Sequence, residues 1–312
     1  MGMIADHLNC VLPRPSQTVS IRTKKDRSLS QAPSLENFLK SSNFTGLAKG
    51  PIALIVVEDD IGVGACIRHH ARLGFKNILL LDATEYDLPA DCQALCVRID
   101  CNLPVHQAVN MVIDACPGRW IYYCYNAEFL HFPFCEDRNI HELISFIQEE
   151  RRAACLSYVV DLYCDDLNVN PLGYSLEAAH LDSSGYFATP RRSKGGFLDR
   201  QLNVYGGLKW RFEEHFSEPK RRIDRICLFE AKKGLKMGGD LLLNDPEYNT
   251  YECPWHNSTT MAVCSFRTAK YLKSNAGSTF EIDSFKWSKT RKFYWNSRQL
   301  MDLGLMEPGQ WF

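Results

Sequence analysis

The chain has 312 residues, 45% of them hydrophobic, so it can bury a large core as one domain or as a domain with an extension. Its 36 basic and 37 acidic residues give a net charge of −1, which argues against a general nucleic-acid-binding protein. With no apolar signal segment and no run long enough to span a bilayer, the sequence predicts a soluble protein.

The 13 cysteines are scattered along the chain. The closest group is Cys92, Cys96 and Cys101, which contains no CxxC pair and has only His106 nearby, so it does not predict a zinc site. Other cysteines stand among apolar residues, where a reduced thiol behaves as a small hydrophobe. This usage is typical of a reducing, cytoplasmic location.

Residues 1–48 are rich in Ser, Lys, Arg and Pro and predict a mobile N-terminal arm, with a short helix over residues 35–39. The basic stretch 22–27 is typical of a solvated tail, although contact with a membrane surface or phosphates is the alternative.

Residues 49–165 predict a regular α/β half. The apolar run 52–57 predicts a strand buried on both faces. Helical spacing follows from Val63 to Gly74, and two more strands are predicted at 76–81 and 94–99. A helix facing the sheet covers 105–112. The later predicted elements are a strand at 120–125, a helix at 140–147 and a strand at 156–163.

This alternation is typical of a doubly wound, mostly parallel sheet. Beyond residue 165 it disappears, and short apolar runs at 226–229 and 261–264 are separated by loop residues. We therefore expect residues 166–312 to form an irregular half of the same domain, with antiparallel pieces and long loops.

Acidic and amide residues close three of the predicted strands. Glu58 and Asp59 follow the first strand, Asp82 the second, and Asn126 and Glu128 the strand 120–125. In open parallel sheets ligands gather at the carboxyl ends of the strands, so these groups predict a nucleotide site. The alternative is that they only end strands and cap helices.

Several common motifs are missing. Ile61-Gly62-Val63-Gly64 lacks the third glycine of a Rossmann fingerprint, and there is no G-K-[ST] loop or G-x-S-x-G elbow. The commonest NAD enzymes, P-loop enzymes and hydrolases are therefore not first choices. The lack of a glycine- and lysine-rich loop after the first strand also weakens a nucleotidyltransferase.

The segment from Val57 to Thr84 resembles the opening of family 2-like glycosyltransferases of the GT-A fold. In that family an asparagine-glutamate pair ends the first strand, a helix with the spacing W-x-x-H-x-x-x-G follows, and an aspartate ends the second strand. Glu58, His70, Gly74 and Asp82 keep those positions here. Residues 128–130 keep the last letters of the family's D-x-D-E-F-L motif, and 206–215 resemble bacterial members of the same group.

The resemblance implies a GT-A-like fold and transfer of a sugar from a nucleotide-diphosphate donor to a glycan, lipid-linked or similar hydroxyl acceptor. Glu58, Asp59 and Asp82 would hold the nucleotide. The family binds Mn²⁺ or Mg²⁺ through two aspartates, but this chain has Tyr125 and Ala127 at those positions. Three outcomes stay open: Glu128, helped by Asn126, holds a cation weakly; basic side chains replace the metal; or the domain only binds.

The remaining candidates lie in the C-terminal half. Arg267, Lys270 and Arg298 are candidates for neutralising a departing diphosphate. The resemblance places His256 beside the cation and diphosphate with Glu128, whereas the simpler interpretation is a histidine bonded within a packed loop. Glu213 and Glu214 are candidates for the general base, or are charged surface residues.

The basic residues Lys220, Arg221, Arg222 and Arg225 are interpreted as a solvated face, with a lipid or polyanionic acceptor as the alternative.

Overall fold

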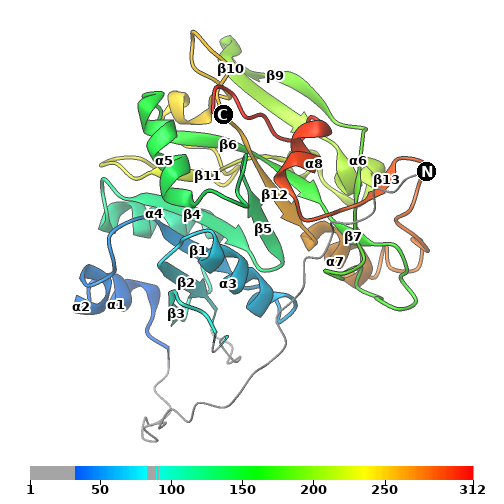
Figure 1. The fold of residues 1–312 in the computed structure, drawn as a ribbon, viewed down its shortest axis with the longest axis horizontal. Coiled ribbons are helices and arrows are strands. Elements are labelled where there is room, and N and C mark those ends of the chain that lie inside the picture. The colour runs from blue at the N-terminus through cyan, green and yellow to red at the C-terminus, as the bar shows by residue number, and fades with distance from the viewer. Residues whose placement is uncertain (1–31, 83–88, 90, 312) are drawn as a thin grey trace, which may run out of the picture. The chain divides into compact units, whose positions relative to one another are not determined.

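The structure is a computed structural model that describes residues 32–82, 89 and 91–311 (Figure 1). Its centre is a mixed sheet of eight strands. In order across the sheet these are β3 (Leu95–Ile99), β2 (Asn77–Leu81), β1 (Ile52–Val56), β4 (Trp120–Tyr125), β11 (Asp224–Glu230), β6 (Ala154–Asp161), β12 (Met261–Ser265) and β5 (Glu128–His131).

The strand directions place most carboxyl ends at one edge of this sheet. β3, β2, β1 and β4 are parallel neighbours, and β12 is parallel to β6. β11 is antiparallel to both β4 and β6, so β6 and β12 point the same way as β4. β5 is antiparallel to β12. Residues that follow β1, β4, β6 and β12 therefore meet residues that open β11 and β5 at the same edge.

The strands form where the sequence has continuous apolar runs. Every residue of β2 and β4 is buried, as expected for strands covered on both faces. Tyr122 and Tyr123 of β4 are fully buried and belong to the main hydrophobic core. The strands predicted at 52–57, 76–81, 94–99 and 120–125 are confirmed.

Eight helices accompany the strands in the described residues, and local sequence signals explain the main ones. α5 begins with a capping box, in which Asn139 and Glu142 each satisfy a free backbone N–H of the first turn. α3 buries Val63, Cys66, Ile67 and His70 on one face. The helices are α1 (Leu35–Leu39), α2 (Ser42–Thr45), α3 (Val63–Arg72), α4 (Val105–Ala115), α5 (Ile140–Glu149), α6 (Gly207–Arg211), α7 (Arg267–Ser274) and α8 (Ser297–Asp302).

The C-terminal half, residues 166–312, contributes more to the main sheet than the sequence predicts. Its two apolar runs form β11 and β12, which are inserted into the main sheet on either side of β6. The remaining strands form a hairpin of β9 (Phe187–Ser193) and β10 (Gly196–Tyr205), and a small sheet of β7 (Tyr163–Cys164), β8 (Ala179–Asp182) and β13 (Thr290–Lys292). The C-terminal half thus supplies an antiparallel strand, β11, and a parallel strand, β12, to the main sheet, in addition to these smaller antiparallel sheets.

The arm predicted over residues 1–48 needs a correction from residue 32 onward. α1 is present as predicted, but Leu35, Phe38, Phe44 and Leu47 are buried in the main core. These apolar side chains hold the segment against the domain. Residues 1–31, including the basic stretch 22–27, lie outside the described residues. Within the described part of the chain, no helix is long and apolar enough to cross a membrane.

Candidate functional site

The residues after β1 are held in place by Asn126, which follows β4. The Asn126 side-chain carbonyl accepts the backbone N–H of Glu58 at 2.9 Å. Its amide donates to Oδ1 of Asp59 at 2.7 Å and to the carbonyl of Ile61 at 2.9 Å. Asn126 is fully buried, so its polar atoms serve the loop and none is presented to a ligand. Its role here is to position Glu58 and Asp59, rather than to bind a cofactor or cation as predicted.

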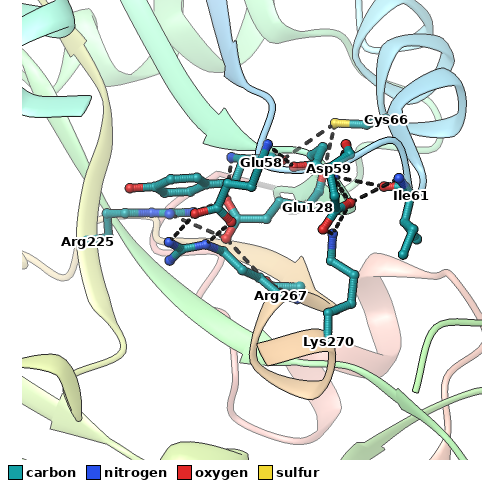
Figure 2. Close-up of polar contacts among 11 residues, drawn as sticks. Glu58, Asp59, Ile61, Cys66, Glu128, Arg225, Arg267 and Lys270 are labelled. Carbon is teal, nitrogen blue, oxygen red and sulfur yellow. Dashed lines mark hydrogen bonds and ion pairs between the residues drawn. The ribbon is translucent and has the colours of Figure 1, made fainter. Parts of the chain in front are cut away.

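Helix α7 brings two cations to those carboxylates. Arg267, the first residue of α7, donates from Nε and Nη2 to the two carboxylate oxygens of Glu58, both at 2.6 Å. Lys270 lies one turn later and donates to both oxygens of Asp59 at 2.7 and 2.8 Å. The Arg267 guanidinium also lies 3.8 Å from the centre of the Tyr125 ring. Figure 2 shows these cationic side chains converging on the carboxylates.

Glu128, the first residue of β5, forms a third ion pair, which is buried. It receives Nη2 of Arg225 at 2.6 Å, the backbone N–H of Tyr125 at 2.9 Å and the hydroxyl of Ser265 at 3.1 Å. Burial acts to raise the pKa of the Glu128 carboxyl, but Arg225 and the other donors outweigh it, and the pKa lies below its ordinary value. Glu128 is therefore a carboxylate whose oxygens are already engaged.

The end of β6 adds a fourth carboxylate, Asp161. Its Oδ2 accepts the backbone N–H of Leu208 at 2.8 Å, while Oδ1 is buried and has no hydrogen-bond partner among the described residues. Burial raises the pKa of Asp161 to about 6. Gly207 has a φ of +63°, and a Cβ there would lie 2.7 Å from Oδ2 of Asp161. This glycine lets the start of α6 approach the strand end closely.

Lys209 of α6 belongs to the same charged group. Burial lowers the pKa of its ammonium, Asp161 opposes that shift, and the charges of Arg267 and Arg225 add to it. Carboxylates and cations are therefore balanced and close enough to influence one another. We call this set the strand-end cluster; it consists of Glu58, Asp59, Glu128, Asp161, Lys209, Arg225, Arg267 and Lys270.

The structure places only some of the predicted site residues together. Glu58, Asp59, Glu128 and Arg267 meet in the strand-end cluster. Asp82 lies at the same edge, at the end of β2, which neighbours β1. Arg298 lies on α8, where it is 83% exposed and pairs with Asp302 of its own helix.

His256 does not join Glu128, contrary to the prediction. It precedes β12 and bonds to Glu150, which precedes β6, so both lie at the amino ends of these strands. Glu128 and Asp161 lie at the opposite edge.

Glu213 and Glu214 are also outside the cluster. They form a short helical turn after α6, are 55% and 61% exposed, and Glu213 pairs with Arg221 at 3.0 Å. Both line an open hollow of about 500 Å³ together with Trp210 and Trp287.

A divalent cation does not fit at Glu128. Mg²⁺ and Mn²⁺ need free oxygen ligands, and the Glu128 oxygens are taken by Arg225, Ser265 and a backbone N–H. Tyr125 and Ala127, which stand where the glycosyltransferase family described above has its two metal-binding aspartates, are also packed against neighbouring residues. The Tyr125 ring lies against Arg267, and the Ala127 methyl is fully buried beside Gly62. Among the described residues, Lys209, Arg225, Arg267 and Lys270 supply the positive charge of the strand-end cluster.

The sequence interpretation missed Asp161 and Lys209 and misjudged Arg225. Asp161 is the last residue of β6. The rule that selected Glu58 and Glu128, namely an acidic residue at the end of a predicted strand, would also have selected Asp161. Arg225 was interpreted as part of a solvated basic face, but its side chain is 6% exposed. Arg225 and its partner Glu128 are 97 positions apart in the sequence, so no local pattern encodes their pairing.

The fold and the site together define an α/β protein that collects paired carboxylates and cations at the carboxyl ends of its strands. The chain matches no known family model, and a search of curated proteins finds no match either.

Proposed function

We propose that this chain is a GT-A-like glycosyltransferase that moves a sugar from a nucleotide-diphosphate donor to a hydroxyl of a glycan or similar acceptor without a divalent cation. The observation that carries the proposal is the meeting of Arg267 and Lys270 with the acidic residues after β1. Ligands of open α/β sheets bind at this edge, and cations there are placed to receive a negatively charged leaving group.

The ion pairs suggest how the donor is accommodated. Glu58 and Arg267 are 37% and 40% exposed, so a ligand can reach them from solvent. A diphosphate offers more acceptor oxygens and more charge than one carboxylate, and it competes for Arg267 and Lys270. Glu58 and Asp59, released from those cations, then accept hydrogen bonds from the nucleotide's ribose hydroxyls or base N–H groups. Asp82 at the neighbouring strand end extends the same acceptor surface.

The transfer step needs no group beyond those the chain and the two substrates supply. The acceptor oxygen forms a bond to the anomeric carbon while the bond from that carbon to the diphosphate oxygen breaks. The electron pair of the broken bond stays on the diphosphate, where Arg267 and Lys270 stabilise the charge. The acceptor's proton passes to a carboxylate, for which the exposed Glu213 and Glu214 remain our candidates.

The hollow beside these glutamates favours an acceptor side at α6. Trp210 and Trp287 line it, and ligand sites commonly combine aromatic surface with a few polar groups. A second function, binding without turnover on the same fold, is favoured by Tyr125 and Ala127, which replace the family's acidic metal ligands.

A thermal-shift screen tests for the nucleotide site that the proposal requires. UDP, GDP, CDP and their sugars are tested with the full chain, in manganese and in EDTA. A rise of the unfolding midpoint with one nucleotide that is equal in manganese and EDTA supports a metal-independent nucleotide site, and release of the free nucleotide diphosphate from its sugar nucleotide then separates transfer from binding without turnover. A rise that needs manganese contradicts the metal-independent part of the proposal, and the absence of any rise favours the binding protein.

A further inference from the structure

A second group of charged and sulfur-bearing side chains lies at the amino-terminal edge of the main sheet. Glu150 follows α5 directly, and Cys253 and His256 belong to the loop that precedes β12. One potential metal-ligating atom from each of the three lies within 4.8 Å of the others. The carboxylate Oε1 of Glu150 is 2.8 Å from Nε2 of His256.

The burial of this group leaves one polar atom unexplained. Cys253 is 3% exposed and Glu150 is 8% exposed. The second carboxylate oxygen of Glu150, Oε2, is buried and has no hydrogen-bond partner in the part of the chain that the structure describes. A buried carboxylate oxygen without a partner is costly, and a bound cation is one way to satisfy it.

The three ligand types specify the ion. A thiolate, an imidazole and a carboxylate together are a donor set suited to zinc, whereas Mg²⁺ and Ca²⁺ take oxygen ligands only. Cys253 and His256 are separated by two residues, so one short loop supplies two ligands while the end of α5 supplies the third. We propose that Glu150, Cys253 and His256 bind a zinc ion.

This site has room for a fourth ligand. The His256 side chain is 15% exposed, so the group is not sealed from solvent on that side. Three protein ligands with the last position open to water is the arrangement of catalytic zinc sites, in contrast to structural sites, which are closed by four protein ligands. The ion would tie the loop before β12 to the end of α5, because its ligands come from both.

A second cysteine–histidine group in the core is a poorer candidate. Cys66 Sγ lies 3.6 Å from Nδ1 of His70, while Cys124 Sγ lies 3.9 Å from Nε2 of the same ring. One ion cannot use both ring nitrogens. Nδ1 is also 2.8 Å from the Cys66 carbonyl, and Nε2 is 3.2 Å from the Tyr122 hydroxyl. This group provides a matched control, since Cys124 is as buried as Cys253.

Metal content of the full chain tests the proposal. The purified protein is loaded with zinc, passed through a desalting column and analysed by mass spectrometry of the metal. We expect about one zinc per chain, from the three-ligand set. Cys253→Ser and His256→Gln should each lower retained zinc at least about tenfold, since loss of a ligand removes much of the affinity. Cys124→Ser should retain it.

Cobalt substitution reports the thiolate ligand directly in variants that remain folded. The cobalt-loaded wild-type chain should show a thiolate-to-cobalt absorption band in the near ultraviolet that is absent in Cys253→Ser and present in Cys124→Ser, with circular dichroism confirming that both variants are folded. Failure of the wild type to retain zinc, or retention by Cys253→Ser and His256→Gln, would overturn the site. Because these residues lie at the opposite edge from the strand-end cluster, neither outcome bears on nucleotide binding.

Discussion

Arg267 and Glu58 form a bidentate ion pair in which both hydrogen bonds are 2.6 Å long. The two residues are 209 positions apart in the sequence. The pair joins the second residue after β1 to the first residue of α7, and the same guanidinium lies over the ring of Tyr125. Both partners are more than a third exposed, so the pair adds little to stability. It holds a planar cation at the strand ends, where the proposed function would have a phosphate group replace Glu58.

The buried pair of Glu128 and Arg225 should behave differently from that exposed pair. Arg225→Met leaves Glu128 buried without its counter-ion, so we expect the free energy of unfolding to fall by about 3–5 kcal/mol. The double variant Glu128→Gln with Arg225→Met removes both charges and should recover part of that loss. Urea unfolding of the two variants measures this, and equal losses in both would show that charge pairing is not what matters here.

Gly207 should be intolerant of a side chain because of Asp161. In Gly207→Ala the new Cβ would lie 2.7 Å from Oδ2 of Asp161, in a backbone conformation with φ of +63°. Gly304→Ala is the matched control, since Gly304 has a φ of +67° and no atom within 4 Å of a Cβ.

Both alanine variants carry the left-handed strain of about 1–2 kcal/mol, and only Gly207→Ala adds the collision. We expect Gly207→Ala to be the less stable of the two in thermal unfolding. Equal unfolding midpoints would mean that the start of α6 moves away from Asp161 without cost.

Asp161 should give the protein a stability that falls as pH rises. Burial raises its pKa from 3.8 to about 6, so the folded state holds this proton more tightly than the unfolded state. The contribution is present below pH 4 and is lost as pH rises through 6, and it amounts to about 3 kcal/mol. Asp161→Asn does not titrate, so its stability relative to the wild type should increase between pH 4 and pH 7. Denaturant unfolding at both pH values measures this, and a constant difference would contradict it.

Introducing an acidic residue at position 127 should not create a metal site. Ala127 is fully buried with a φ of +57°, and a Cβ on neighbouring Gly62 would be 3.0 Å from its methyl. Ala127→Asp would bury a carboxylate in this packed contact, so we expect a loss of about 1–3 kcal/mol in stability. It should gain no manganese dependence in nucleotide binding. A stable variant that binds nucleotide only with manganese would show that the position is still open to a metal ligand.

The sequence was sufficient for the strands and helices whose signals are local. Continuous apolar runs gave β1, β2 and β4, and the Asn139 and Glu142 spacing marks the start of α5. The same local logic placed Glu58 and Glu128 at one edge, because β1 and β4 are parallel neighbours.

The pairings across the site depend on strand order, which local patterns do not encode. β11 and β12 enter the sheet on either side of β6, and this insertion brings Arg225 and Arg267 to the cluster. The prediction for His256 failed for the same reason. It lies before β12 rather than after it, and a parallel strand puts those two positions at opposite edges of the sheet.

The most direct test of the account is calorimetric measurement of nucleotide-diphosphate affinity in EDTA. The wild type is compared with Arg267→Gln and with Arg298→Gln, which removes an exposed arginine outside the cluster. We predict binding in EDTA that Arg267→Gln weakens at least about tenfold, corresponding to the loss of about 1.4 kcal/mol or more from a charge-assisted contact. Arg298→Gln should bind as the wild type does. No binding of any nucleotide diphosphate, or equal binding by Arg267→Gln, would contradict the account.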